Sequence, residues 1–369
     1  MLAPKHLTKC VKGDYRLIAI SDIHGHLDRF KALLKKVQYR PREDYLVILG
    51  DFIEKGDQVL ETIHYVMELS KLPRVYVLTG NCEWALCAIM SEPELAKEIP
   101  LYLKRVSSNG IVRTLYNEGH YEDGHETPLG IQRDIARKLH DELLFCEHLP
   151  TTLKFNDFIF VHAGLEPRED YKQCGLSSYL EFQHFMDYGH LLKETVIVGH
   201  LPTSNYREGQ INNDILYDEK KRIISIDGGT GVKMISQLNA LIITSKNGEV
   251  TFHQKKVQPL PKAIITEDYH PQYHDSHKIA FPYYKVEVLE EGTQFSKCYQ
   301  EETHQILMIK NEFLYIRNKD YYCLDDYIDA FLDVKKQDEI ALIGVYGNYA
   351  YGIYDGQVGW IPYHNIKIK

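Results

Sequence analysis

The stretch Ser21-Asp22-Ile23-His24-Gly25-His26 decides the fold, and it follows an apolar run at residues 17–20. An apolar strand that ends in Asp-x-His-Gly presents a carboxylate and an imidazole at its end, where the glycine permits a sharp turn. Asp22 and His24 are two residues apart, so in extended backbone they project to the same side and could bind one ion. If this stretch stood alone, a solvated turn with Asp and His would be the commoner explanation.

Four more segments of this kind follow in order, each at the end of another apolar run. They are Gly50-Asp51-Phe52-Ile53-Glu54-Lys55-Gly56, Gly80-Asn81-Cys82-Glu83, His162-Ala163-Gly164-Leu165 and Gly199-His200-Leu201-Pro202-Thr203. Together the five segments supply oxygen and nitrogen ligands that suit divalent transition metals. Six such ligands with one shared carboxylate match the needs of a two-metal site with ions about 3.5–4 Å apart.

This ordered set resembles the calcineurin-like metallophosphoesterases, whose pattern runs DxH, GDxxxxG, GNH[DE], H and GH. Residues 160–165 and Ile226-Asp227-Gly228-Gly229-Thr230 resemble one branch in particular, the PPP-type serine/threonine phosphatases and symmetrical diadenosine tetraphosphatases. The resemblance covers about residues 15–255. It implies an α/β fold, a four-layer α/β/β/α sandwich in which two facing sheets are flanked by helices.

The resemblance also implies a metal site and a reaction. The expected metal ligands are Asp22, His24, Asp51, Asn81, His162 and His200. The first three would hold one ion, and Asp51 would bridge to a second ion held by the others. A hydroxide between the two ions would attack phosphorus. Manganese is the expected metal, and iron or zinc also suits these ligands.

Two departures from the family pattern bear on catalysis. The phosphatase branch carries Asp-Arg within GDxVDRG, whereas this chain has Glu54-Lys55. The compact ammonium of Lys55 therefore stands where the branch has a planar guanidinium that can bind phosphate through two hydrogen bonds. The histidine of GNHE is Cys82 here, and a neutral thiol is a poor general acid near pH 7. Other calcineurin-like enzymes, mostly small phosphodiesterases, carry GNC[DE]. The predicted catalytic residues are Asp51, Asn81, Lys55 and Cys82.

Lys55 is the first candidate for contact with substrate phosphate. Arg168 and His26 are further candidates, although a surface salt bridge is the favoured explanation of Arg168. His26 and Glu83 lie close enough in sequence to supply a leaving-group proton, but a structural role is favoured for both.

Three functions are consistent with this site. The favoured one is a hydrolase of phosphomonoesters, including phosphoserine or phosphothreonine in proteins. The alternative is a dinucleoside polyphosphate hydrolase or phosphodiesterase, whose leaving groups need less acid assistance, and Cys82 fits this alternative better. The third is a catalytically weak metal-binding scaffold, which the loss of the family's histidine and arginine would suit.

Composition narrows the class of protein. The chain is 44% hydrophobic and 26% charged, with a net charge of −9 and no basic tract, which argues against a nucleic-acid groove. No apolar run approaches the ~20 residues of a membrane span, and residues 1–11 do not resemble a signal peptide. The seven cysteines are scattered singly. We therefore expect a reduced, cytoplasmic protein.

The chain is long enough for two domains. We expect a tail at 1–14, a metallophosphoesterase domain at 15–258 with a helical insertion at about 91–150, a linker at 259–282, and an SH3-like β-barrel at 283–369. Helical periodicity predicts helices after residues 27 and 60 and another over 129–146.

The prediction of a barrel depends on one stretch, an Asp355-Gly356 hairpin followed by Gly359-Trp360-Ile361-Pro362, which resembles part of a bacterial SH3-like domain. Its aromatic residues could line a groove for a proline-rich or extended peptide, but filling of the core is favoured. They are Tyr346, Tyr349, Tyr351, Tyr354, Trp360 and Tyr363.

Overall fold

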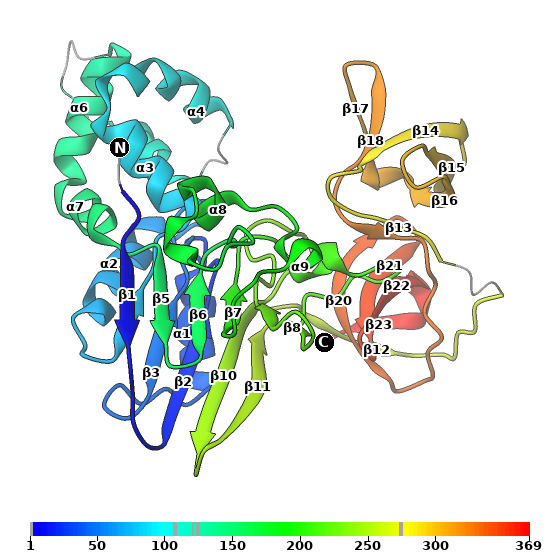
Figure 1. The fold of residues 1–369 in the computed structure, drawn as a ribbon. Coiled ribbons are helices and arrows are strands. Elements are labelled where there is room, and N and C mark those ends of the chain that lie inside the picture. Colours follow the sequence, from blue (N-terminus) through cyan, green and yellow to red (C-terminus); the bar gives the residue numbers. More distant parts are fainter. Residues whose placement is uncertain (1–2, 106–108, 120–121, 123–125, 273–275) are drawn as a thin grey trace. The chain divides into compact units, whose positions relative to one another are not determined.

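The structure, a computed structural model, describes residues 3–105, 109–119, 122, 126–272 and 276–369 (Figure 1). The chain divides into two compact units. The N-terminal unit comprises Met1–Thr203, Asp214–Val232 and Gln237–Val257, and the C-terminal unit comprises Ser204–Asn213, Lys233–Ser236 and Gln258–Lys369. Two short segments from the first two thirds of the sequence therefore fold with the C-terminal strands.

The N-terminal unit contains two β-sheets. A five-stranded sheet has the order β11-β10-β2-β3-β4, and a six-stranded sheet has the order β1-β5-β6-β7-β9-β8. The five strands are β2 (Tyr15–Ile20), β3 (Tyr45–Ile48), β4 (Val75–Val77), β10 (Leu238–Lys246) and β11 (Glu249–Val257). The six are β1 (His6–Lys9), β5 (Thr152–Phe155), β6 (Phe158–Val161), β7 (Thr195–Val198), β8 (Leu216–Asp218) and β9 (Ile223–Ser225).

Alternation along strand β2 explains how the layers pack. Ile18 and Ile20 belong to a core that the helices share, whereas Leu17 and Ala19 belong to a core shared with the second sheet, which contributes Phe160. Successive strand residues point to opposite faces, so a strand buried on both faces is apolar throughout. Strand β2 pairs in parallel with β3, and β3 with β4. The carboxyl ends of these three strands therefore share one edge of the sheet.

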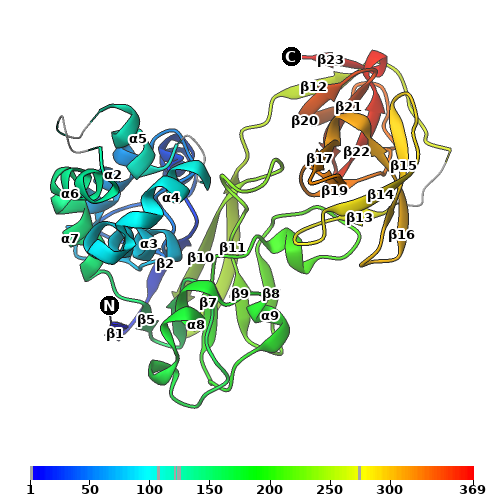
Figure 2. The same cartoon turned by 90° about the horizontal axis from the view of Figure 1, so that it is seen from above.

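Helices connect these parallel strands and cover one face of the sheet. They are α1 (Leu27–Lys36), between β2 and β3, and α2 (Val59–Ser70), between β3 and β4. The chain from β4 to β5 contains α3 (Asn81–Ser91), α4 (Ile99–Arg105), α5 (Ile111–Asn117), α6 (Pro128–Lys138) and α7 (His140–His148), and α8 (Leu176–Glu181) and α9 (Phe185–Tyr188) lie between β6 and β7 of the six-stranded sheet. The predicted helices after residues 27 and 60 are confirmed. In Figures 1 and 2, α6 and α7 lie beside α3, and these helices contact one another. None of the described helices is long and apolar enough to cross a membrane.

The prediction of one continuous helix over 129–146 is wrong. Helix α6 ends at Leu139, where the backbone leaves helical geometry at φ −92° and ψ 20°, and α7 starts at His140. Leu139 is buried in the helical core, which the break permits. The loop predicted around residues 117–125 falls partly outside the described residues.

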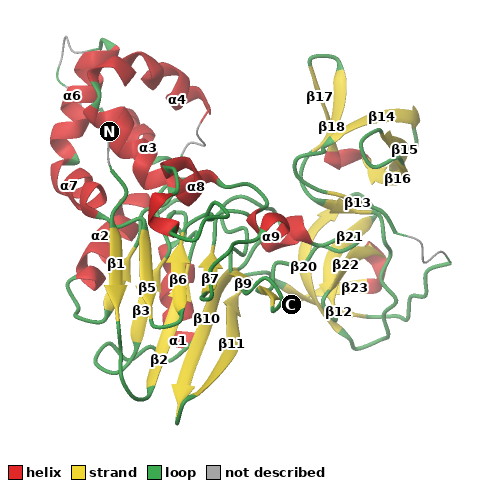
Figure 3. Ribbon diagram, in the orientation of Figure 1, coloured by secondary structure: helices red, strands yellow, loops and turns green. Residues whose placement is uncertain are grey.

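The C-terminal unit is built from strands in separate sheets (Figure 3). One sheet has the order β22-β21-β20-β12-β23, another has the order β16-β15-β14-β18-β17, and β13 pairs with β19. The bounds are β12 (Lys262–Ile265), β13 (Lys278–Ile279), β14 (Lys285–Glu290), β15 (Phe295–Gln300), β16 (Gln305–Lys310), β17 (Leu314–Arg317), β18 (Asp320–Cys323), β19 (Tyr327–Ile328), β20 (Glu339–Tyr346), β21 (Tyr349–Tyr354), β22 (Gln357–Pro362) and β23 (Ile366–Ile368). Strands β12 and β13 lie within the segment expected to be a linker.

Aromatic side chains fill the core of this unit. Trp360 and Tyr351 are fully buried, and their rings stack with centroids 4.4 Å apart. Phe313 and Tyr327 complete the same cluster. Tyr363 is 44% exposed. Trp360 and Tyr351 therefore fit the favoured interpretation, in which the aromatic residues fill the core.

Candidate metal centre

The expected ligands come from five loops that meet at the carboxyl ends of strands. Asp22 follows β2, Asp51 follows β3, Asn81 begins α3 after β4, His162 follows β6 and His200 follows β7. Hydrogen bonds tie the loops together: the His24 amide donates to the Asp51 carbonyl (3.0 Å) and the His200 amide to Asp22 Oδ2 (3.0 Å). Loops at the carboxyl ends of parallel strands are a common place for binding sites in α/β proteins.

Two glycines let the carboxylates approach the backbone closely. A Cβ at Gly199 would lie 2.3 Å from Asp22 Oδ2, and one at Gly80 would lie 2.2 Å from Asp51 Oδ1. Four of the expected ligands have left-handed backbone: Asp22 (φ 53°), His24 (φ 48°), Asp51 (φ 50°) and His200 (φ 68°). Such strain gathers at functional sites, where the surrounding fold holds it in place.

The first ligand group joins one imidazole and two carboxylates. Nδ1 of His24 lies 3.1 Å from the Ile53 carbonyl, to which it donates, so Nε2 carries the lone pair. That Nε2 lies 3.8 Å from Asp22 Oδ1 and 3.7 Å from Asp51 Oδ2. A histidine oriented through its second nitrogen in this way is typical of a metal ligand.

The second ligand group brings acceptor atoms to hydrogen-bonding distance of one another. Nδ1 of His162 donates to the Leu49 carbonyl (2.9 Å), so its Nε2 is also a lone-pair atom, and it lies 3.0 Å from Asn81 Oδ1 and 3.5 Å from Asp51 Oδ1. Nδ1 of His200 lies 3.0 Å from the same Asn81 oxygen. Lone pairs of Asn81 and His162 that face each other are stabilised by a cation.

The electrostatics of the site favour metal binding. Burial lowers the pKa of His24 and that of His200 to about 3, so both imidazoles are neutral. Burial, followed by the charge of Asp51, raises the pKa of Asp22 to about 7. Burial opposes ionisation of Asp51 too, but the charge of Lys55 and the hydrogen bond from the Cys82 amide are among the interactions that outweigh it and lower its pKa. Neutral imidazoles and an ionised bridging carboxylate are the forms that bind metals.

The donor set therefore fits divalent ions. Two groups of side chains have their donor atoms within 4.8 Å of one another, namely His24, Asp51 and Cys82, and Asp22, Asp51 and His162. Asp51 belongs to both groups, as a shared carboxylate requires.

Glu83 holds the loops of the site in place. Its buried carboxylate accepts hydrogen bonds from the amides of Asp51 (2.8 Å), Phe52 (3.0 Å), Ile53 (3.2 Å) and Gly80 (2.8 Å). Burial, followed by the charge of Asp51, raises the pKa of Glu83 to about 7. These contacts give Glu83 the structural role that the sequence favours for it.

Cys82 also acts on Asp51. Its amide donates to Asp51 Oδ1 (2.9 Å) and its thiol to Asp51 Oδ2 (3.1 Å). Burial raises the pKa of the Cys82 thiol well above its usual value. The thiol proton is therefore strongly held and is directed at a metal-ligand carboxylate.

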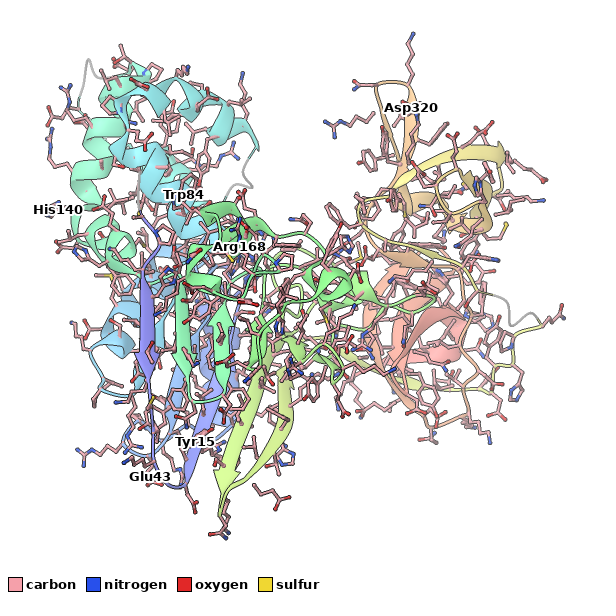
Figure 4. All side chains as sticks on the ribbon, viewed as in Figure 1. Tyr15, Glu43, Trp84, His140, Arg168 and Asp320 are labelled. Carbon is pink, nitrogen blue, oxygen red and sulfur yellow. The ribbon has the colours of Figure 1, made fainter. Side chains whose placement is uncertain are left out.

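The three predicted substrate contacts have different surroundings. Nζ of Lys55 lies 3.1 Å from His24 Nε2, inside the ligand group. Nδ1 of His26 donates to the His24 carbonyl (2.6 Å), and a Cβ at Gly231 would lie 3.2 Å from His26 Cε1 and 3.3 Å from Lys55 Cβ. Arg168, labelled in Figure 4, pairs with Glu166, and its side chain is 52% exposed. This is the surface salt bridge that the sequence analysis favours for Arg168.

Two residues of the site carried no role in the sequence analysis. Asp227 is buried, and burial followed by the charge of Asp22 raises its pKa well above the usual value. Its motif, Asp-Gly-Gly-Thr, was the available signal. Gln183 lies 2.9 Å from Nε2 of His200, and no motif marks it.

Comparison with known proteins gives results of three kinds. The family model of the calcineurin-like phosphoesterases matches residues 15–228. The symmetrical bis(5'-nucleosyl)-tetraphosphatase of Buchnera aphidicola (subsp. Schizaphis graminum) is 40% identical over 72 residues, which are 20% of this chain and 26% of that protein. The enzyme of the same name from Pseudomonas syringae is 32% identical over 80 residues, or 22% and 27% of the two chains.

These matches span about a quarter of each curated relative. The crystal structure of a proposed diadenosine tetraphosphatase is 17% identical, with a TM-score of 0.44, over 68% of this chain and 98% of that chain. The family model, by contrast, covers more than half of the sequence and includes all five ligand loops. The chain belongs to the calcineurin-like phosphoesterase family.

Proposed function

We propose that this protein hydrolyses the phosphoanhydride chain of dinucleoside polyphosphates at a two-metal site. The observation that carries the proposal is the hydrogen bond from the Cys82 thiol to Asp51 Oδ2 (3.1 Å), at the position where the family's phosphatases carry a histidine. Names of relatives that match part of the chain support the same substrate class. The sequence alone favours phosphomonoesters over dinucleoside polyphosphates as substrates. The Cys82 contact and the names of the relatives lead us to prefer dinucleoside polyphosphates.

The reversal follows from the demands of the leaving group. Hydrolysis of a serine phosphate expels an alkoxide, which needs a proton as the bond breaks. Hydrolysis of a phosphoanhydride expels a nucleotide whose terminal phosphate is already stable as an anion. The Cys82 proton is held by burial and by Asp51, so it is poorly placed to protonate an alkoxide. A site that lacks an acid is better suited to the anhydride.

Two divalent ions, manganese being our choice, would when bound generate a nucleophile from water at neutral pH and neutralise charge on the phosphoryl oxygens. Asp22, His24 and Asp51 would hold one ion. Asn81, His162 and His200 would hold the other, with Asp51 shared. Glu83 and Cys82 keep Asp51 oriented for both.

Lys55 and His26 would supply cationic and hydrogen-bonding contacts to the phosphate chain. Gly231 lies against both side chains, and any larger residue there would crowd His26 Cε1 and Lys55 Cβ. Arg168 is left out of this set because its guanidinium already pairs with Glu166.

We also propose that the N-terminal unit is a four-layer α/β/β/α sandwich and that the C-terminal strands form an SH3-like barrel. A proline-rich or extended peptide is the ligand class that we propose for this barrel.

A parallel hydrolysis assay tests the proposed function. The Mn²⁺-loaded protein is given diadenosine tetraphosphate, p-nitrophenyl phosphate, bis-p-nitrophenyl phosphate and a phosphopeptide, with Asp51→Asn as the control. We expect diadenosine tetraphosphate to turn over fastest, and one water consumed per two ADP released would identify symmetrical cleavage. Preference for the phosphopeptide would instead support a protein phosphatase. No turnover above the control would favour a metal-binding scaffold.

Cys82→His tests the leaving-group argument directly. An imidazole at this position could supply a proton, so we expect hydrolysis of alkyl phosphates to rise more than hydrolysis of the dinucleotide. Cys82→Ser is the matched control, because it keeps a small donor to Asp51 without adding an acid. Equal changes for both substrates would show that Cys82 does not occupy the place of an acid.

A further inference from the structure

The Lys55 ammonium lies among the metal ligands rather than outside them. Its Nζ is 3.1 Å from His24 Nε2, and the ionised carboxylate of Asp51 attracts it. Lys55 is the only lysine of the described residues with a hydrogen bond to one of the six expected ligands. The residue as a whole is half-buried.

The tautomer of His24 decides what this contact means. Nδ1 donates to the Ile53 carbonyl (3.1 Å), which leaves the Nε2 lone pair as the acceptor for the Lys55 ammonium. The same lone pair points toward Asp22 and Asp51, and it is the one that His24 would offer to a metal. One lone pair cannot bind an ammonium proton and a metal ion together.

We propose that Lys55 competes with the divalent metal for Nε2 of His24, and that metal binding displaces the ammonium toward the substrate phosphate. The first half concerns the metal site alone, and the second half rests on the proposed function. Lys55 would thus act as a stand-in cation before metal binding and as a phosphate contact afterwards.

The loop is built so that the side chain can move while the backbone stays fixed. The neighbouring Glu54 is buried, and its Oε1 accepts the Ile111 amide at 3.1 Å. A Cβ at Gly56 would lie 2.3 Å from the His24 carbonyl, so the loop packs directly on the first ligand segment. The four-carbon stem of lysine carries a compact charge on rotatable bonds, so its end can swing without moving this backbone.

Charge also favours exchange. The lysine places a single positive charge beside the buried carboxylates of Asp22 and Asp51, whereas a divalent ion supplies two. The ion therefore gains more from the same carboxylates than the ammonium does. The cost of displacing Lys55 is the loss of one charge-assisted hydrogen bond, which sets how much the lysine weakens metal binding.

Calorimetric titration of the metal-free full chain with Mn²⁺ tests the competition. In Lys55→Met we expect one of the two binding steps to tighten by about tenfold, since a hydrogen bond from a charged group no longer opposes the metal. Lys55→Gln, which keeps a donor without the charge, should lie between the native protein and Lys55→Met, and it serves if the methionine variant does not fold. Lys71→Met is the matched control, because Lys71 is exposed and pairs only with Glu68 among the described residues.

Binding of inorganic phosphate tests the second half. In the Mn²⁺-loaded protein, Lys55→Met should weaken phosphate binding by about tenfold, whereas in the metal-free protein the substitution should leave phosphate binding unchanged. Unchanged or weaker Mn²⁺ binding in both Lys55 variants, with Asp51→Asn weakening it as a ligand should, would overturn the competition. These readouts require no turnover, so an inactive protein that shows the tightening would refute the proposed function and leave the competition intact.

Discussion

Both units bury charged side chains, and the two clusters are built on opposite principles. In the C-terminal unit, Asp326 accepts hydrogen bonds from Lys233 Nζ (2.6 Å), Tyr284 Oη (2.8 Å), Ser204 Oγ (3.2 Å) and the Phe281 amide (3.2 Å). In the metal centre, Asn81 Oδ1 faces His162 Nε2, and Asp22 and Asp51 face His24 Nε2, so acceptor meets acceptor.

The difference separates a structural cluster from a binding site. Lys233 balances Asp326, and their side chains are only 4% and 3% exposed, so the pair is complete within the protein. The metal centre has more acceptors than donors, and its carboxyl groups respond with shifted pKa values, as in Asp22, where burial raises the pKa to about 7. A buried cluster with more acceptors than donors is suited to a cation from outside.

Asp51→Asn would break the metal centre most completely. Asp51 is shared by both ligand groups, and an amide cannot supply the bridging negative charge. We expect hydrolysis to fall on the order of 10³-fold or more, with loss of bound metal. Elemental analysis alongside the assay measures both, and a variant that kept its metal and its rate would contradict the shared role.

Asp326→Ala would break the C-terminal cluster without touching the metal. Leaving Lys233 buried and unpaired should lower the free energy of unfolding by about 3–5 kcal/mol, measured by chemical denaturation. The double variant Lys233→Met, Asp326→Leu should recover most of that loss, because apolar residues can replace a buried pair. Metal bound per folded molecule should not change; its loss would show that the two clusters are not independent.

Glu83→Gln sharpens the role of a residue that orients ligands without binding metal. The oxygen of the glutamine side chain can still accept hydrogen bonds from some of the four backbone N–H groups. Its NH₂ group cannot accept, and it would face N–H donors where a carboxylate oxygen stood. We expect metal affinity to fall by about 10–100-fold. Glu68→Gln, on the surface, is the control, and equal affinities in the two variants would remove Glu83 from the site.

The pH dependence of metal binding tests the protonation state of Asp22, a carboxyl group of the candidate metal centre. Metal binds ionised Asp22, whose pKa burial raises to about 7, so below pH 7 the ion that Asp22 would hold must first displace a proton. Affinity should therefore fall by up to about tenfold per pH unit as the pH drops from 7, and rise little above it. Titrations in buffers of different ionisation enthalpy count the proton, and a flat profile would show that Asp22 is ionised beforehand.

The sequence predicts most of the candidate metal centre because each expected ligand follows an apolar strand at a recognisable motif. Strand alternation and the order of motifs place Asp22, Asp51 and His162 without any knowledge of contacts. The position of Lys55 could not be predicted in this way, since it depends on where a flexible stem comes to rest. Gln183 is likewise brought to His200 by tertiary packing that no local pattern records.

Local sequence patterns predict the strands of the N-terminal unit better than they predict helix breaks or the pairing of strands that are far apart in the chain. Periodicity continues across Leu139, so the break between α6 and α7 is visible only in the backbone angles of that residue. Strand β12 is only four residues long, and its pairing with β20 and β23 joins segments far apart in the chain. Pairing at that distance leaves no trace in a short stretch of sequence.

The division of the chain has a consequence for how the two units could be separated. The sequence passes between the units at residues 203/204, 213/214, 232/233, 236/237 and 257/258. A fragment ending at Val257 would keep Lys233 and Ser204 but lose Asp326, their common partner. A cut at a single junction therefore cannot separate the two units without removing partners from the Asp326 cluster.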